Sequence, residues 1–344
     1  MFGQLKARVL RGALIVSLVA ITSTVRAEPS RESCEGGALA SGDGETAGMV
    51  FIPGGSFSMG SDGRHPEERF SHEVRVDGFW IDRHEVTNAE FADFVKATGY
   101  MTLAERGLDP KTHPNMTGDL TAPGSVVFIP PTRLDRGGDI TQWWQYVKGA
   151  NWREPEGPRS SIKGKENYPV VHVAYEDALA YAKWRGRDLP TEAQWEYAAR
   201  GGHEISDDWS EAFDKDGKPI ANSWQGIFPV YNTEQDGYGW QAPAGCFAPN
   251  AYGLYDMIGN VWEWTADWYV PGHRREAALN PSGPALLELR VAAGQAPSKV
   301  IKGGSYLCST NYCTRYRATA RQPQEADLSA GHLGFRTVLN RPRQ

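Results

Sequence analysis

The sequence predicts an irregular, loop-rich α+β fold in a single domain. The chain has 344 residues with 38 glycines, 22 prolines and 12 tryptophans, a composition that favours long ordered loops pinned by aromatic side chains. Short helix signatures alternate with short strand signatures, and no internal repeat interrupts them. Three hundred residues are enough to bury a large core.

The first 27 residues are predicted to be a secretory signal peptide. Basic side chains (Lys6, Arg8 and Arg11) precede an almost wholly apolar run at 12–21, and the small residue Ala27 ends the segment. The alternative is an N-terminal helix that stays attached, but the apolar run is too short to anchor a helix across a bilayer. We therefore expect an exported protein, either periplasmic or secreted.

Charge narrows the choice of partners. The formal net charge is −6, and removal of the basic leader makes the remainder more acidic. An acidic surface disfavours nucleic acid and anionic lipid, and no later segment is apolar enough to cross a membrane. We expect no nucleic-acid or membrane partner, and a monomer.

The first elements follow a flexible segment at 28–48, which is rich in Gly, Ser, Ala and Glu. Residues 49–60 predict a strand, a turn and a second strand, and the alternation at 72–79 predicts a half-buried strand. Thr87 and Glu90 form a capping-box pattern that predicts a helix to about Ala97.

Two further helices precede a long irregular region. Residues 101–168 are dense in Pro, Gly and Trp and predict mostly irregular backbone. Helices are predicted at 176–185 and after Thr191, where Gly201 ends the second one. From residue 203 onward only short strands and loops are expected.

Cys308 and Cys313 stand five positions apart near the C-terminus. Five positions diverge on either a helix or a strand, so the sulfurs converge only if a turn separates them. Ser, Thr and Asn at 309–311 favour a turn, and Gly303-Gly304 frees the approach. Two converged thiolates suit Cu(I), whereas structural zinc would need four ligands. A short structural disulfide is the alternative on spacing alone.

The remaining cysteines, Cys34 and Cys246, are predicted to form a disulfide that tethers the N-terminal segment, because the expected compartment is oxidising.

The eight histidines contain no His-x-x-x-His pair, so they form no obvious metal constellation. Ser305 has no evident His/Asp partners for a hydrolase triad.

Several motifs together resemble the formylglycine-generating enzyme (sulfatase-modifying factor) family. The similarity covers most of 49–340, which we expect to be the catalytic domain, and the cysteine pair within Gly-Gly-Ser-Tyr-x-Cys…Tyr-Cys-x-Arg-Tyr-Arg marks its catalytic branch. The segments that carry the resemblance are 49–59, 148–158, 189–197, 222–238, 253–264, 303–317 and 334–336.

The resemblance implies a fold similar to that of C-type lectins and a copper- and O2-dependent oxidase. Such an enzyme converts a cysteine in a Cys-x-Pro-x-Arg segment of an unfolded sulfatase to Cα-formylglycine, with a thiol as reductant. It implies that Cys308 and Cys313 hold Cu(I) as a dithiolate. It also implies that Ser305 makes a polar contact beside the copper and that Trp262 lines the pocket. The simpler alternatives are a turn serine and a core tryptophan.

Two oxygen-rich loops resemble the two structural Ca²⁺ sites of the same family. Hard oxygen ligands on irregular backbone suit Ca²⁺, although such loops are often only solvated or capping. The resemblance implies one site from Asn222, the Ser223 carbonyl, Asp236 and the Tyr238 carbonyl. It implies a second from Asp256, the carbonyls of Gly259 and Val261, and Glu263.

One substitution limits what can be transferred from the family, and the predicted export leaves two other functions open. Ser309 stands where animal members carry histidine, and an exported enzyme must meet its substrate unfolded outside the cytoplasm. One alternative is an exported oxidase of the same fold that acts on another peptide or a siderophore precursor. The other is a non-catalytic, lectin-like binding module, which retention of both thiols disfavours.

Overall fold

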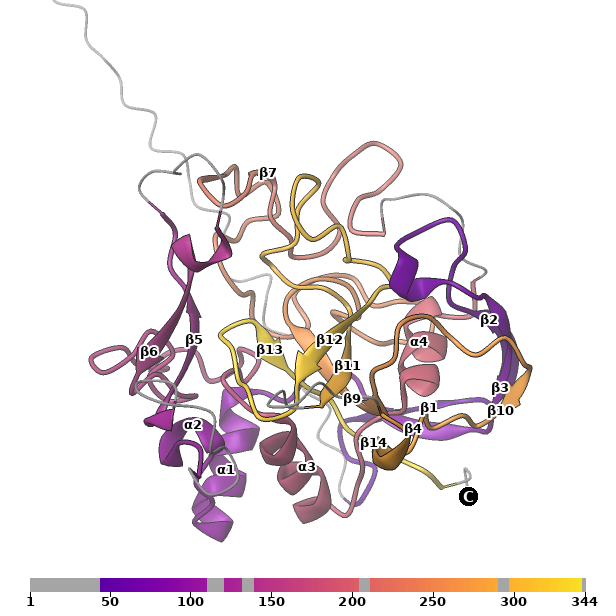
Figure 1. Ribbon diagram of the computed structural model, residues 1–344, viewed down its shortest axis with the longest axis horizontal. Helices are drawn as coiled ribbons and strands as arrows, with labels where there is room; N and C mark the ends of the chain where they lie inside the picture. Colours follow the sequence, from indigo (N-terminus) through magenta and orange to yellow (C-terminus); the bar gives the residue numbers. More distant parts are fainter. Residues whose placement is uncertain (1–43, 110–120, 132–138, 204–210, 290–296, 342–344) are drawn as a thin grey trace, which may run out of the picture. The chain divides into compact units, whose positions relative to one another are not determined.

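A computed structural model describes residues 44–109, 121–131, 139–203, 211–289 and 297–341 (Figure 1). They all belong to one compact unit, 32–344. The predicted signal peptide, Cys34 and most of the 28–48 segment lie outside the described residues. Among the described residues, no helix combines the length and apolar character of a membrane span.

The architecture confirms the predicted α+β, loop-rich class. The described part contains four α-helices, α1 (Asn88–Thr98), α2 (Leu103–Arg106), α3 (Tyr175–Trp184) and α4 (Glu192–Arg200). The described residues also form three single-turn 3-10 helices: η2 (Pro66–Glu68), η4 (Ile140–Gln142) and η5 (Leu286–Glu288). Small sheets and long loops make up the rest.

A four-stranded sheet carries the segments that build the site. Its order is β12-β11-β9-β13, comprising β12 (Arg321–Glu325), β11 (Ser298–Lys302), β9 (Trp262–Trp268) and β13 (Leu333–Gly334). β11 runs antiparallel to both neighbours, whereas β13 runs parallel to β9 and pairs Leu333 with Trp262. The chain segment after β11 and the segment before β13 therefore lie at the same end of the sheet.

Two three-stranded sheets and two strand pairs surround it. The first sheet has the order β1-β4-β14, from β1 (Met49–Ile52), β4 (Phe79–Asp82) and β14 (Val338–Leu339). The second has the order β10-β3-β2, from β10 (Ala278–Leu279), β3 (His72–Val76) and β2 (Gly55–Met59). The pairs are β5 (Gly124–Phe128) with β6 (Trp144–Lys148), and β7 (Gly226–Ile227) with β8 (Tyr231–Asn232).

The helices begin where their capping residues predicted. Thr87 accepts from the Glu90 amide while the Glu90 carboxylate accepts from Thr87, and Gly99 ends α1 with φ 69°. Thr191 and Gln194 form the same box at α4. α4 then packs between the four-stranded sheet and the β2–β3 pair (Figure 1).

Two predictions from pattern were incomplete. The single strand predicted at 72–79 ends at Val76 as β3, and Phe79 begins β4, which belongs to a different sheet. The region 101–168, expected to be mostly irregular, contains α2 and the β5–β6 pair. β5 and β6 are stabilised by pairing across a long connection, which no local period reveals.

The buried hydrophobic residues that the structure describes form three clusters. Cys308 belongs to the first, and Cys313 packs against it. The third cluster is mostly aromatic and consists of Phe128, Trp143, Trp224, Phe228, Tyr306 and Leu307. Aromatic side chains thus fill the space that regular elements leave open beside the 303–317 segment.

Candidate active site

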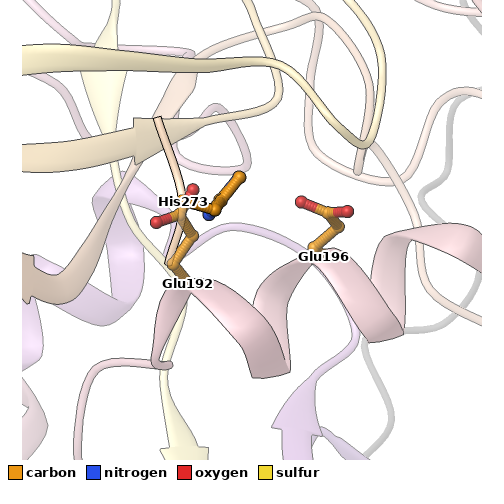
Figure 2. Close-up of side chains that lie close together, drawn as sticks. All are labelled: Glu192, Glu196 and His273. Atoms are coloured by element: carbon orange, nitrogen blue, oxygen red, sulfur yellow. The ribbon is translucent and has the colours of Figure 1, made fainter. Parts of the chain in front are cut away.

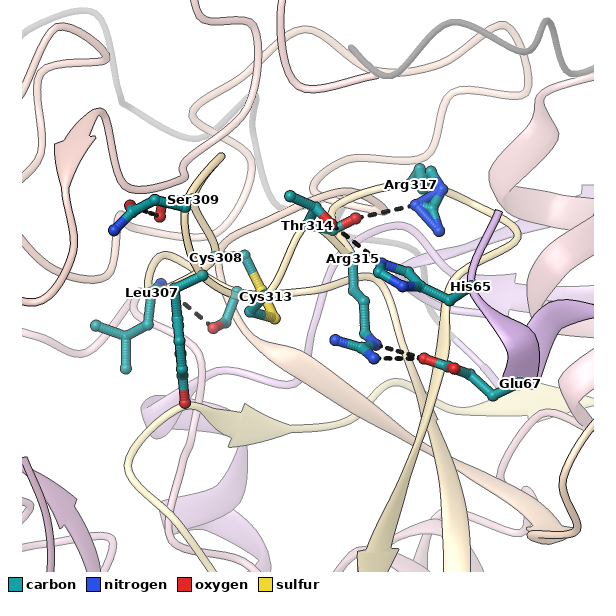
Figure 3. Close-up of a disulfide and its surroundings, with 12 residues drawn as sticks. His65, Glu67, Leu307, Cys308, Ser309, Cys313, Thr314, Arg315 and Arg317 are labelled. Carbon is teal, nitrogen blue, oxygen red and sulfur yellow. Dashed lines mark hydrogen bonds and ion pairs between the residues drawn. A yellow bond between two sulfur atoms is a disulfide. The ribbon is translucent and has the colours of Figure 1, made fainter. Parts of the chain in front are cut away.

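The cysteine pair lies on a tight loop that follows β11. Ser309 and Tyr312 exchange two backbone hydrogen bonds, and Cys313 adopts a left-handed φ of 43°. This turn brings the Cα atoms of Cys308 and Cys313 to 4.8 Å, and the two sulfurs are joined as a disulfide (Figure 3). The predicted convergence across a turn is confirmed.

Glycine permits the close approach of the loop's two arms. Gly304 has φ 77°, and a Cβ there would lie 2.9 Å from the Cα of Tyr316. A side chain at this position would therefore push the two cysteine-bearing arms apart.

The far side of the loop is fixed by an amide clamp. Asn311 accepts from the Phe228 backbone N–H at 3.1 Å and donates to the Phe228 carbonyl at 3.0 Å. The rings of Phe228 and Tyr312 stack at 4.2 Å with an 8° interplanar angle. The Ser309 hydroxyl donates to the Asn311 side-chain oxygen at 2.7 Å. The loop is thereby held at its tip as well as at its base.

Two arginines after Cys313 are paired with acidic residues of η2. Arg315 Nε donates to the Glu67 carboxylate at 2.8 Å (Figure 3). Arg317 pairs with the buried Glu68. Burial would raise the pKa of Glu67, but its backbone hydrogen bond and Arg315 hold that pKa below its usual value. The Glu67 carboxylate is therefore ionised at neutral pH, and the two ion pairs fix the outgoing arm of the loop.

A pocket of about 280 Å³ opens beside the sulfurs. Cys308, Cys313, Ser305 and Trp262 all line it, so the structure brings the four predicted catalytic residues together. Ser305 and Trp262 are almost fully buried, and the Ser305 hydroxyl accepts from the Leu307 N–H at 3.3 Å. Their chemical roles stay predictions.

Other lining residues were not singled out from the sequence. They come from distant segments and include Trp144, Tyr312, Arg315, Gln322, Gln324 and His332. His332 is the clearest residue that the sequence analysis did not single out, because it belongs to no spacing typical of metal-binding or catalytic histidines. Its backbone carbonyl accepts from the Trp262 N–H at 2.8 Å, which fixes it beside a predicted site residue.

In the first set of predicted calcium ligands, Ser223 and Tyr238 both contact Asp236 through their backbone. The Ser223 and Tyr238 N–H groups donate to the two oxygens of Asp236 at 3.0 and 2.9 Å. Asn222 is buried, and its side-chain oxygen has no hydrogen-bond partner. The Gln225 amide nitrogen contacts both the Ser223 carbonyl and Asp236, so a donor sits among these oxygens. An oxygen set with one unmet buried acceptor fits a hard cation.

In the second set of predicted calcium ligands, one carboxylate is already bound by an arginine. Glu263 is fully engaged, because Arg336 donates to both of its oxygens at 2.7 Å. Burial raises the pKa of Asp256 to about 6, and burial and the Asp256 charge raise the pKa of nearby Glu85 well above its usual value. Glu85 Oε2 is buried without a partner. This surplus of buried negative charge also fits a cation, with Glu85 as a candidate ligand that the sequence did not indicate.

Glu192, Glu196 and His273 form a separate cluster that could hold a metal by distance alone (Figure 2). Its carboxylates are already neutralised by buried cations. Arg321 binds Glu192 through two hydrogen bonds, and Lys302 lies 2.9 Å from Glu196. Burial alone would raise the pKa of Glu196, but Lys302 and Arg200 hold it far below its usual range. We interpret the cluster as a structural ion network.

Comparison with known proteins identifies relatives that match most of the chain. The family profile described as sulfatase-modifying factor enzyme 1-like domain matches residues 38–341. Two relatives named formylglycine-generating enzyme, from Mycobacterium tuberculosis and Mus musculus, are 47% and 44% identical to the chain. The alignments cover 85% of this chain in both cases, and 97% and 75% of the relatives.

Two more distant proteins mark the breadth of the similarity. A Bos taurus protein named inactive C-alpha-formylglycine-generating enzyme 2 is 36% identical over 86% of this chain and 89% of its own length. The solved structure of PvdO from Pseudomonas aeruginosa superposes with a TM-score of 0.56 at 25% identity, covering 85% of this chain and 93% of that one.

Fold and site together define an α+β protein with a paired-cysteine pocket built on loops. The chain belongs to the formylglycine-generating enzyme family of oxidoreductases, as the profile match and the identities show.

Proposed function

We propose that this enzyme oxidises a cysteine of an unfolded polypeptide to Cα-formylglycine, with O2 as oxidant and a thiol as reductant. One substrate thiol, one O2 and two reductant thiols give one aldehyde, one hydrogen sulfide, one water and one reductant disulfide, so atoms and electrons balance. O2 takes up four electrons, two from the substrate carbon as its C–S bond is replaced by C=O and two from the reductant thiols. The observation that carries the proposal is the convergence of Cys308 and Cys313 on the wall of an open pocket.

Copper is part of the proposal, and the residues present fit it. Two sulfur ligands that share one turn suit a soft, low-coordinate ion, and no carboxylate is among the described residues that line the pocket. Bound Cu(I) would supply the one-electron chemistry that O2 requires. The disulfide must be reduced before the pair can hold the ion, which gives the thiol reductant a second use.

The residues that line the pocket determine which substrate groups can reach the sulfurs. Trp262 and Trp144 provide apolar walls that limit water around the sulfurs, and Ser305 places a hydroxyl on the same pocket. A pocket of about 280 Å³ accepts one or two side chains rather than a folded domain. An extended segment therefore fits, and we propose a Cys-x-Pro-x-Arg segment of an exported sulfatase as the substrate.

Calcium is proposed as a structural ion. Support comes from the unmet Asn222 oxygen in the first loop and from the surplus carboxylate charge around Asp256 in the second. Ions there would tie together loops that contain little regular secondary structure.

The decisive experiment is mass spectrometry of a synthetic Cys-x-Pro-x-Arg peptide incubated with reduced enzyme, Cu(I), O2 and a thiol. We expect loss of the thiol and gain of an aldehyde, trapped by a hydrazine reagent. A peptide with serine in place of cysteine should stay unchanged. If the cysteine peptide also stays unchanged at full copper loading, the proposed function is wrong, and a different substrate or a binding role replaces it.

A further inference from the structure

His332 lies on the pocket wall next to the cysteine loop. Its ring packs against Trp144 with centroids 4.6 Å apart, and Trp144 Nε1 donates to the Tyr312 hydroxyl at 3.3 Å. Tyr312 immediately precedes Cys313. The imidazole, the indole and the phenol thus form one continuous wall that reaches the sulfurs.

One ring nitrogen of this imidazole, Nδ1, is buried without a hydrogen-bond partner among the described residues. A buried polar group left unsatisfied costs about 1–3 kcal/mol. Burial also lowers the pKa of His332 to about 3, so at neutral pH the ring has one donor nitrogen and one acceptor nitrogen. An apolar side chain would fill the same space without this cost.

The segment that carries His332 is held rigidly from behind. The Ser125 hydroxyl contacts both the carbonyl and the hydroxyl of Ser329, at 2.8 and 2.7 Å. The buried His172 bonds the Ser125 hydroxyl through Nδ1 at 2.8 Å, and its backbone N–H donates to the Ala330 carbonyl at 3.1 Å. These bonds hold the backbone just before His332, and the packing of its ring on Trp144 orients the imidazole, an arrangement that favours a pre-organised contact.

We propose that His332 is a substrate-positioning residue, which hydrogen-bonds a backbone peptide group of the substrate next to its reacting cysteine. This inference rests on the proposed function, since it assigns a contact within the same pocket. A peptide group offers an N–H and a C=O, and either can pair with the imidazole. Backbone groups are free in an unfolded chain but paired in a folded one, so this contact selects for extended polypeptide largely independently of side-chain sequence.

The test combines variants of the enzyme with variants of the substrate backbone. His332→Phe keeps a ring of similar shape and removes the hydrogen bond, while His332→Asn restores a short donor and acceptor. His203→Phe, on an exposed residue outside this pocket, is the matched control. Each enzyme is assayed with peptides in which one amide near the cysteine is replaced by an ester, position by position.

For His332→Phe we expect about a ten-fold rise in KM for the all-amide peptide, the effect of one lost hydrogen bond, with kcat changed much less. One ester position should impair the natural enzyme about ten-fold and His332→Phe not at all. His332→Asn should recover part of the loss, and the melting temperature of His332→Phe should not fall. A purely structural histidine would instead lower the melting temperature and leave every ester equally tolerated, and that result would overturn the proposal.

A binding measurement separates this inference from the proposed function. A fluorescent peptide with serine in place of cysteine cannot react, and its affinity for the reduced protein is read by anisotropy. We expect about ten-fold weaker binding to His332→Phe than to the natural enzyme or to His203→Phe. Equal affinities, alongside normal peptide oxidation, would refute the role of His332 and leave the function intact. Failure to oxidise any peptide would refute the function instead.

Discussion

Arg336 and Glu263 form a fully buried bidentate ion pair, with the guanidinium Nε and one terminal nitrogen each 2.7 Å from a different carboxylate oxygen. Trp195 Nε1 donates to the same carboxylate at 2.7 Å. The pair joins the C-terminal Gly-Phe-Arg segment to β9 and α4. Glu263 is consequently a structural anchor for three elements near the pocket.

Arg336→Met should destabilise the protein by about 3–5 kcal/mol, because it leaves the Glu263 charge buried and unpaired. Urea denaturation monitored by tryptophan fluorescence measures the change. Arg274→Met is the control, since Arg274 pairs with Glu288 on an exposed surface at 3.1 Å and should cost less than about 1 kcal/mol. Similar losses in the two variants would contradict the assignment of Arg336 as an anchor.

Cys308→Ser and Cys313→Ser should each abolish peptide oxidation while the fold stays intact, because serine is nearly isosteric with cysteine. A competition titration of the reduced protein against a Cu(I) chelator should show one tight copper site per chain. Either variant should lose this site. Cys246→Ser should retain the site. If Cys313→Ser kept both copper affinity and turnover, the pair would have only a structural role.

Chelation of calcium should lower the melting temperature, because it removes a ligand that binds only the native state. Elemental analysis of the purified protein should find calcium before chelation and none after it. Asn222→Ala should weaken retention of one ion and reduce the effect of the chelator. An unchanged melting curve, with no calcium retained, would show that the loops hold together through hydrogen bonds alone.

Acid should destabilise the protein through His172, which is fully buried, and His332, whose Nδ1 is buried. Burial lowers the pKa of His332 to about 3 and of His172 to about 4, both from an ordinary value of 6.5. The unfolded chain therefore binds more protons below pH 6.5, so the free energy of unfolding is lost as pH falls toward the native pKa. Each histidine contributes a slope of at most about 1.4 kcal/mol per pH unit between its native and unfolded pKa values.

Replacing one of these histidines isolates its share of that slope. His332→Phe should lose stability less steeply than the natural protein over this range, by at most about 1.4 kcal/mol per pH unit. Urea denaturation at several pH values provides the comparison. Parallel curves would mean that His332 is already protonated in the native state at about pH 5.

Local chemistry explains which elements could be predicted from the sequence. The helices after Thr87 and Thr191 were predicted because a capping box lies entirely within four residues. β5 and β6 were missed because they pair across the connection between residues 128 and 144, and because neither Gly-Ser-Val-Val-Phe nor Trp-Gln-Tyr-Val-Lys alternates strictly between polar and apolar residues. Packing, rather than pattern, makes these residues strands.

The same distinction applies to the site. The cysteine pair was predicted because both thiols and their turn occupy one short segment. His332 carries no motif of its own and becomes part of the site only through Trp144 and Trp262, which lie far away in the chain. Glu85 likewise could not be predicted as a candidate ligand from the sequence, because only the fold places it beside Asp256. Tertiary contact defines these residues, and a single sequence does not contain it.

The position of β14 has a consequence for synthesis. β14 closes the first sheet by pairing with β4, and the Thr337 N–H bonds to Asp82 across 255 residues of chain. The His332 segment, β13 and β14 must therefore have been synthesised before this sheet and the pocket can close. Contacts between segments so far apart in the chain give the native topology a high contact order, which slows folding. The pocket is completed only after segments as distant as Val126 and His332 have met.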